Sequence, residues 1–143
     1  MAITSAICNS FKQEILEAEH NFTASTGDTF NLALYDSDAT LSKSTTAYTT
    51  SEELATTGGY TAKGKALTSV TPVLDSDTAV CDFANISWTS ASFTARGCLI
   101  FNDDNSDTSV CAIDFGGDKT VTSGTFTVEF PAAAAATAII AIA

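Results

Sequence analysis

The sequence has few basic residues. It contains six Lys and Arg against 17 Asp and Glu in 143 residues, which gives a formal net charge of −11. A nucleic-acid-binding protein needs a basic footprint that displaces counterions from phosphates, and the sequence contains no basic cluster. The same negative charge disfavours binding to an anionic membrane surface. We therefore expect neither a nucleic acid nor a membrane as a partner.

The sequence also lacks a leader and a long apolar run. The N-terminus, MAITSAICNSFKQ, has no basic region followed by an apolar core, as a secretory signal would have. The apolar C-terminus, TAIIAIA, is far shorter than the ~20 residues of a membrane helix. We expect synthesis in a cytoplasm, where cysteines stay reduced.

Metal-binding patterns are missing too. No two of the four cysteines form a CxxC pair and there is one His, so a zinc site is not expected. The strand cysteines lie beside other apolar residues, as small core residues do. The four are Cys8, Cys81, Cys98 and Cys111. The sequence predicts four free core thiols and no cofactor.

The abundant residues are Thr, Ser and Ala, whereas Pro occurs only twice, a composition that suits a β protein with short turns. A chain of 143 residues can bury roughly 70% of its unfolded surface in one core. We therefore predict a single β-sandwich domain over residues 10–143. Residues 1–9 are expected to form an extended N-terminal arm.

The stretch over residues 92–131 carries the strongest strand signals. Residues 98–101 are an unbroken apolar run, and residues 110–115 form a second run that stops at Gly116. Residues 125–130 alternate between apolar and polar side chains, the period of a strand with one buried face. This predicts a meander of three strands joined by two polar turns, which must pack on a second layer.

Further strands are expected on both sides of this stretch. Residues 29–35 alternate strictly, residues 66–73 and 78–83 suggest a hairpin, and residues 137–143 suggest a closing strand after a loop. One helix is predicted over residues 10–20, with Ser10 and Gln13 as a capping box. Its apolar face would comprise Phe11, Ile15, Ala18 and Phe22. The fold class is all-β: an antiparallel β-sandwich, jelly-roll-like, with one short N-terminal helix.

Two groups of polar residues are weighed as sites. His20 has no motif that supplies a nucleophile, and its place at a helix C-terminus, beside free carbonyls, explains it equally well. Asp103, Asn105 and Asp107 begin like a calcium loop, but the Gly and Glu of such a loop are missing. Runs of Asn and Asp are also common hairpin turns, so no metal site is predicted. Asp36 with Asp38, and Asp75 with Asp77, are weaker cases of the same pattern.

Arg96 and several aromatic residues are the remaining candidates. Arg96 lies in a strand-like apolar context and is expected to form a structural ion pair. Its candidate partners are Asp82, Asp114 and Glu129. A sugar-stacking surface of aromatic side chains is conceivable, but aromatics at strand spacing are more often core. These side chains are Tyr48, Tyr60, Trp88 and Phe93. No catalytic, cofactor-binding or metal-binding residue is assigned, and an enzyme is the poorest fit.

From Phe11 onward the sequence resembles a group of small virion proteins of tailed bacteriophages, including cyanophages and other marine phages. The matching segments are FKQEIL, HNF, FNLALYDSDATL, TTAYTTSEEL, GGYTAKGKAL, FTARGCLIFND, AIDFGGDKTVTSGTFTVEFP and AIIAIA. The most distinctive are TARG followed by IFN, and DFGGDK. The resemblance implies a structural virion protein and carries no catalytic or cofactor residues.

Within that group, the resemblance favours a capsid decoration (cement) protein on the outer surface of the head. It would stabilise the head by bridging major capsid protein subunits, and by analogy with such proteins it would form a homotrimer. The alternative is a tail or fibre module that contacts host surface glycans. A hydrolase is a remote third reading.

Overall fold

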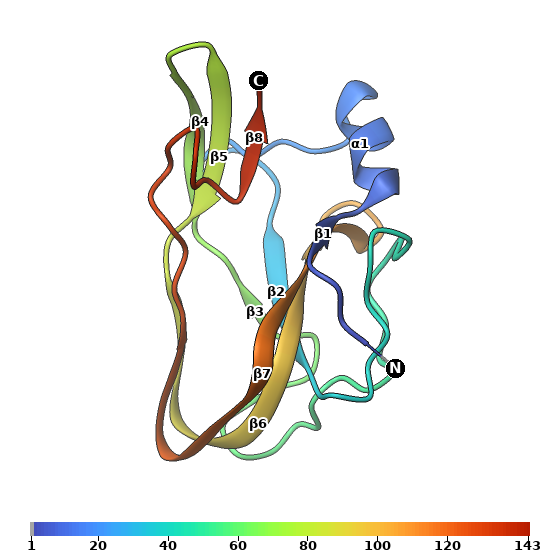
Figure 1. Cartoon of the computed structure of the whole chain (residues 1–143), viewed down its shortest axis with the longest axis vertical. Helices are drawn as coiled ribbons and strands as arrows, with labels where there is room; N and C mark the ends of the chain where they lie inside the picture. The colour runs from blue at the N-terminus through green and yellow to red at the C-terminus, as the bar shows by residue number, and fades with distance from the viewer. Residues whose placement is uncertain (1) are drawn as a thin grey trace.

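The computed structural model describes residues 2–143 and consists mainly of two antiparallel sheets (Figure 1). Strands comprise 48% of the residues and helix 6%, which confirms an all-β sandwich with one short N-terminal helix. The larger sheet has the strand order β1-β7-β6-β2-β3, and the smaller has the order β4-β5-β8. No helix within residues 2–143 is long and apolar enough to span a membrane.

The elements follow one another along the chain as short strands and one helix before the hairpin of β6 and β7. Their bounds are β1 Ala6–Ile7, α1 Asn9–Leu16, β2 Phe30–Tyr35, β3 Lys65–Ala66, β4 Ser69–Asp75, β5 Thr78–Phe83, β6 Ile86–Asn102, β7 Thr108–Val128 and β8 Ile140–Ile142. The strand expected over residues 66–73 is therefore divided. Ala66 pairs with β2 in the larger sheet, whereas β4, from Ser69 onward, pairs with β5 in the smaller sheet.

The expected three-stranded meander is instead a hairpin of two long strands, β6 and β7. They pair from Asn102↔Thr108 to Ile86↔Val128. Gly116 and Gly117, at which the sequence predicts a second turn, lie in a bulge of β7. In this bulge the four residues 115–118 of β7 lie opposite the single residue Arg96 of β6. Gly116 has φ +77°, which suits the bulge and needs no reversal of the chain.

Both long strands also bend back on themselves. The pairing shifts between Trp88 and Phe93 of β6, where Ser90 has φ 50° and Ser123 on β7 has φ 47°. Bulges at matching heights turn the two strands together, so the hairpin curves from one layer into the other (Figure 1). β7 therefore has the shape of a U, with one arm in each layer.

The core lies between the layers and is dominated by apolar residues of β2, β6 and β7. Phe30, Leu32 and Leu34 of β2 are fully buried, as their alternation predicts. All four cysteines are buried, which confirms their expected place in the core. A second cluster on the outer side of the large sheet is covered by Ile3 and Leu41.

The helix is shorter than predicted and starts without the capping box. Cys8 is the N-cap, and the Ser10 hydroxyl is buried without a hydrogen-bond partner. The helix ends at Leu16 because the backbone turns into the left-handed region at Ala18 (φ 62°). Phe22 is buried, but it belongs to the segment that follows the helix.

The segment before the helix is extended and packs on the large sheet. Ile3 bridges to Leu41, Ala6–Ile7 pairs with β7, and the Ser5 hydroxyl accepts a hydrogen bond from the backbone N–H of Asp114 (2.8 Å). Ile3 and Cys8 are buried. These residues therefore contribute to the body of the domain.

Candidate functional site: an open groove along strand β7

The loop that contains Asp103 and Asp107, whose sequence begins like a calcium loop, binds the side chain of a lysine. Lys63 Nζ lies 2.7 Å from Asp103 Oδ1 and 3.0 Å from Asp107 Oδ1. Asn105 points elsewhere and donates to the backbone carbonyl and the carboxylate of Glu19. The ammonium group thus takes the position between the carboxylates, and the loop is a structural ion-pair site.

His20 is enclosed in a polar network. Its side chain is fully buried, and Nε2 lies 2.7 Å from Glu14 Oε2. Asn102 Nδ2 contacts His20 Nδ1 (3.0 Å) and donates to Asp28 Oδ2, while Asn102 Oδ1 accepts from the Asp104 N–H. The bonds to Asp28 and Asp104 determine which side of the Asn102 amide carries the NH₂ group. This NH₂ group donates to His20 Nδ1, so the proton of the imidazole ring is on Nε2. The network joins the segment after α1 to the β6–β7 turn; the expected role at a helix end is wrong.

Arg96 forms the expected structural ion pair, with one additional partner. Its Nε lies 3.3 Å from Asp114 Oδ1, and its Nη1 lies 3.2 Å from Asp118 Oδ1. The two carboxylates stand at the two ends of the bulge, so the guanidinium bridges it. The side chain is about one-third exposed and not buried as its apolar context suggested.

The aromatic residues are core. Trp88 is 3% exposed and Tyr60 is 2% exposed; the two rings pack together, Tyr60 also packs with Phe93, and Trp88 also packs with Phe126. Tyr48 stacks on Phe101. The two largest aromatic side chains therefore have no free face on which a sugar could stack.

The thiols and the tyrosines also lack the environment of reactive groups. Burial raises the pKa of Cys81 and of Cys111 to about 12, so both stay protonated and unreactive at neutral pH. Burial, together with a hydrogen bond to Glu53, raises the pKa of Tyr48 to about 12. Asp36, Asp38 and Glu52 lie within 4.8 Å of one another on the surface, where the Asp38 N–H donates to Asp36 Oδ1. That bond accounts for the turn.

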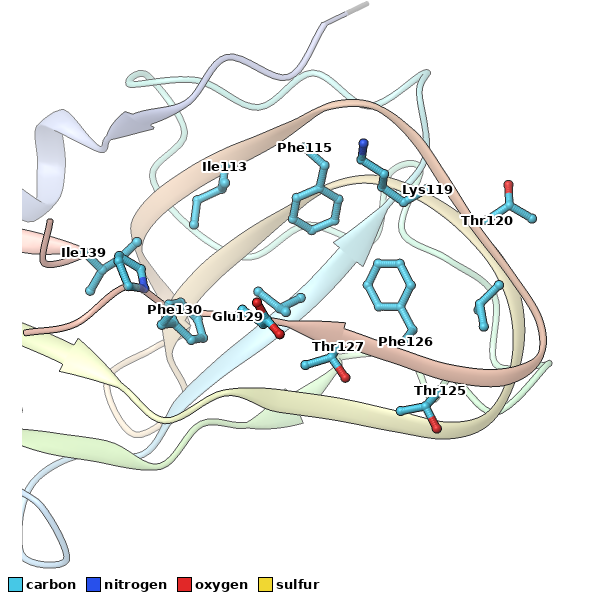
Figure 2. Close-up of a pocket in the computed structure, with 13 residues that line it drawn as sticks. Ile113, Phe115, Lys119, Thr120, Thr125, Phe126, Thr127, Glu129, Phe130 and Ile139 are labelled. Carbon is cyan, nitrogen blue, oxygen red and sulfur yellow. The ribbon is translucent and has the colours of Figure 1, made fainter.

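A groove of about 600 Å³ lies between the two arms of β7 (Figure 2). Its walls are mainly half-buried apolar side chains: Ile113, Phe115, Val121, Phe126, Val128 and Phe130. Figure 2 shows Ile113 and Phe115 on one arm and Phe126 on the other, with Ile139 at one end. The groove is thus an open side of the sandwich core.

The groove runs beside a free strand edge. β7 neighbours only β6 and β1, and β1 pairs with residues 111 and 112 alone. From residue 115 to residue 128, the outer edge of β7 has no strand partner within residues 2–143. An unpaired edge presents backbone N–H and C=O groups that can pair with another chain.

A second apolar surface lies at the other end of the molecule, between α1 and β8. Leu16, Leu74 and Ile142 are 88%, 73% and 53% exposed. A groove of about 320 Å³ there is lined by Ile15, Leu16 and Ile142, among others. Exposed apolar patches of this kind mark protein contacts more often than catalytic sites.

The sequence signals for the β7 groove were present but were interpreted differently. Phe126, Val128 and Phe130 were assigned to a buried face, and the structure leaves them half-buried. The overlooked signal is that residues 120–128 contain no charged residue and no proline in a strongly acidic chain. Such a run is typical either of an inner strand or of an edge that meets a partner.

Comparisons of the chain with protein-family models, with curated proteins and with solved structures give no match. The resemblance to phage virion proteins therefore rests on the sequence segments quoted above.

Proposed function

We propose that this protein is a structural component of a tailed-bacteriophage virion: a capsid decoration protein on the outside of the head. It would act by binding the major capsid protein and bridging its subunits. The proposal combines the sequence resemblance with one structural observation, the exposed apolar surface at α1 and β8, where Leu16 and Ile142 are 88% and 53% exposed. An exposed apolar surface of this kind suits contact with another protein.

The acidity of the chain supports an outer position. A formal charge of −11 is tolerable outside a DNA-filled shell, whereas an inner position would face the packaged phosphates. Repeated over a lattice, an interface of even about 1,000 Å² per copy would strengthen the shell. The homotrimer expected above is an analogy with known decoration proteins; it competes with the dimer proposed below, and sedimentation equilibrium decides between the two.

The alternative, a tail or fibre module for host glycans, has less support. Its aromatic platform would need Trp88 and Tyr60 at the surface, and both are buried. Copy number distinguishes the two roles, because a decoration protein coats the head in large numbers and a tail module occurs in a few copies.

The decisive experiment compares normal particles with particles that lack this protein. We expect the depleted particles to lose DNA at lower temperature and under milder osmotic shock, and added purified protein to restore resistance. Adding the Leu16→Ser variant, after its folding has been checked by circular dichroism, tests whether the apolar surface at α1 and β8 takes part. Equal resistance of depleted and normal particles would reject the decoration role.

A further inference from the structure

The free edge of β7 lacks most of the usual protection against pairing. Natural edge strands are kept from pairing by charged residues, proline, short length or bulges, and of these residues 120–128 have only the bulge near Ser123. Residues 120–128 are nine consecutive uncharged residues rich in Thr, Val and Phe, without proline, and they lie on an edge with no strand partner in the described part of the chain. This edge has the properties of one that pairs with another strand.

The charges at the two ends of this segment are opposite. Lys119 precedes it and Glu129 follows it, and both side chains are exposed. Neither makes an ion pair within residues 2–143. Gly124 lies midway between them, so the segment is complementary in charge to a reversed copy of itself.

We propose that the groove and the β7 edge bind a second copy of this chain, by antiparallel pairing of residues 119–129 around a twofold axis near Gly124. In that arrangement each Lys119 lies opposite the Glu129 of the second copy, so two ion pairs close the ends of the ladder. A twofold interface is made from the same patch on both subunits, and the patch must therefore be self-complementary. A parallel arrangement would instead place like charges together.

The overall charge also favours a second copy over a different partner. A basic partner would be attracted to the many acidic residues of this chain, whose net charge is −11. The groove is locally neutral, with Lys119 and Glu129 as its only charged lining residues. It is therefore a surface on which two equally acidic molecules can meet with little repulsion.

The bend in β7 is compatible with this pairing. The twofold axis would run parallel to the arms of the U and midway between them, just outside the free edge of β7. The β7 strand of the second copy would then lie beside the first strand, bent in the same way and running in the opposite direction. The two grooves would open on the same side and join. The half-buried Phe115 and Phe126 of each copy would be covered at the junction, which lowers the exposed apolar area of both (Figure 2). The inference does not depend on a role in a phage head.

Sedimentation equilibrium over a concentration series tests the pairing with four proteins: wild type, Lys119→Glu, Glu129→Lys and the double variant. We expect a wild-type dimer. Each single variant would create two like-charge pairs and raise the dimer Kd about ten-fold, and the double variant would restore it by exchanging the charges. Both positions are exposed, so thermal melts of all four proteins should coincide at concentrations well below the dimer Kd, where association does not stabilise the native state.

Cross-linking provides a second readout that does not depend on affinity. A Gly124→Cys substitution would bring two thiols together at the axis, and antiparallel neighbours have Cα separations that suit a disulfide. Mild oxidation should give a covalent dimer, and Ser44→Cys, on a distant exposed loop, should not. A wild-type monomer, a trimer, a dimer indifferent to the charge variants, or equal cross-linking at both positions would each overturn the proposal.

Discussion

The two outer edges of the large sheet differ in how far other parts of the chain cover them. On the β2 side, β3 pairs with Asn31 and Leu32, and the long loop continues the cover: the Leu54 N–H donates to the Leu34 carbonyl, and the Leu34 N–H donates to Tyr60 Oη. On the β7 side, β1 pairs with residues 111 and 112 and Ala47 bridges to Thr108, whereas residues 115–128 have no strand partner within residues 2–143. A long polar loop with little regular structure is therefore what closes one side of this sandwich.

Glu53 holds that loop in place. Its carboxylate accepts hydrogen bonds from the hydroxyls of Tyr48 and Tyr60 and from the backbone N–H of Lys63 (2.6 Å). One half-buried carboxylate thus ties three parts of the loop to the sheet. On the β7 side, the ion pairs of Arg96 connect β6 to the two ends of the bulge in β7 and do not fasten a covering loop.

A matched pair of glycines gives the largest expected difference between the two sides. Gly64 and Gly116 have similar backbone angles, φ +70° and +77°. A Cβ at Gly64 would lie 2.6 Å from the Leu32 carbonyl carbon, whereas a Cβ at Gly116 would meet nothing within 4 Å. We expect Gly64→Ala to cost about 3 kcal/mol or more and Gly116→Ala about 1 kcal/mol.

Urea unfolding monitored by tryptophan fluorescence measures both glycine variants against wild type. Equal losses at the two positions would mean that backbone strain alone decides the cost. The close approach of the loop to β2 would then contribute nothing.

Removal of the loop's anchor should have the next largest effect. Glu53→Ala leaves two tyrosine hydroxyls and one backbone N–H without their acceptor, and we expect a loss of about 2 kcal/mol in the free energy of unfolding. Hydrogen exchange should show faster exchange at Leu34 and Leu54, with little change along β7. A uniform increase in exchange would contradict a local role for Glu53.

Asp82 offers a stabilising change in the smaller sheet. It is 2% exposed, its Oδ2 has no hydrogen-bond partner, and burial raises the pKa of its carboxyl group. A raised pKa in the folded state means that stability is lost as pH rises through that pKa. Asp82→Asn should therefore stabilise the protein by about 1 kcal/mol at pH 7 and by little in acid. Thermal melts at several pH values test this; a pH-independent gain would exclude ionisation as the cause.

The smallest effect is expected at Arg96. Its ion pairs are exposed to solvent, and pairs of this kind contribute little to stability. We expect Arg96→Gln to leave the melting temperature unchanged within error at physiological salt. A clear drop would show that the bulge needs the bridge to keep its shape.

Local patterns predicted the strands but not how they join. The alternation of Phe30, Leu32 and Leu34 was sufficient for β2, because a half-buried strand must alternate whatever its neighbours are. The pair Gly116–Gly117 suits both a turn and a bulge, and only the renewed pairing at Lys119↔Ala95 distinguishes them. The helix end was misplaced because the left-handed Ala18 has no signal in its residue type.

The polar sites were harder to predict because their partners are distant in sequence. His20 meets Asn102, and the loop at Asp103 and Asp107 meets Lys63. The sequence shows the carboxylates but not the lysine that neutralises them. The open groove was hidden for the same reason: a half-exposed phenylalanine and a buried one are identical in sequence.

The fold-back of the β6–β7 hairpin also brings the walls of the groove together. β6 pairs with β2 only over residues 97–102. At the bend, the two layers are therefore joined by β6 and β7 alone. Residues 58 and 59 lie against this two-stranded ribbon. A two-stranded hairpin alone is marginally stable, so the bend needs support from side chains on its inner face. The bend brings the two arms of β7 close enough for Phe115 and Phe126 to face each other across the groove, with their ring centroids 6.2 Å apart.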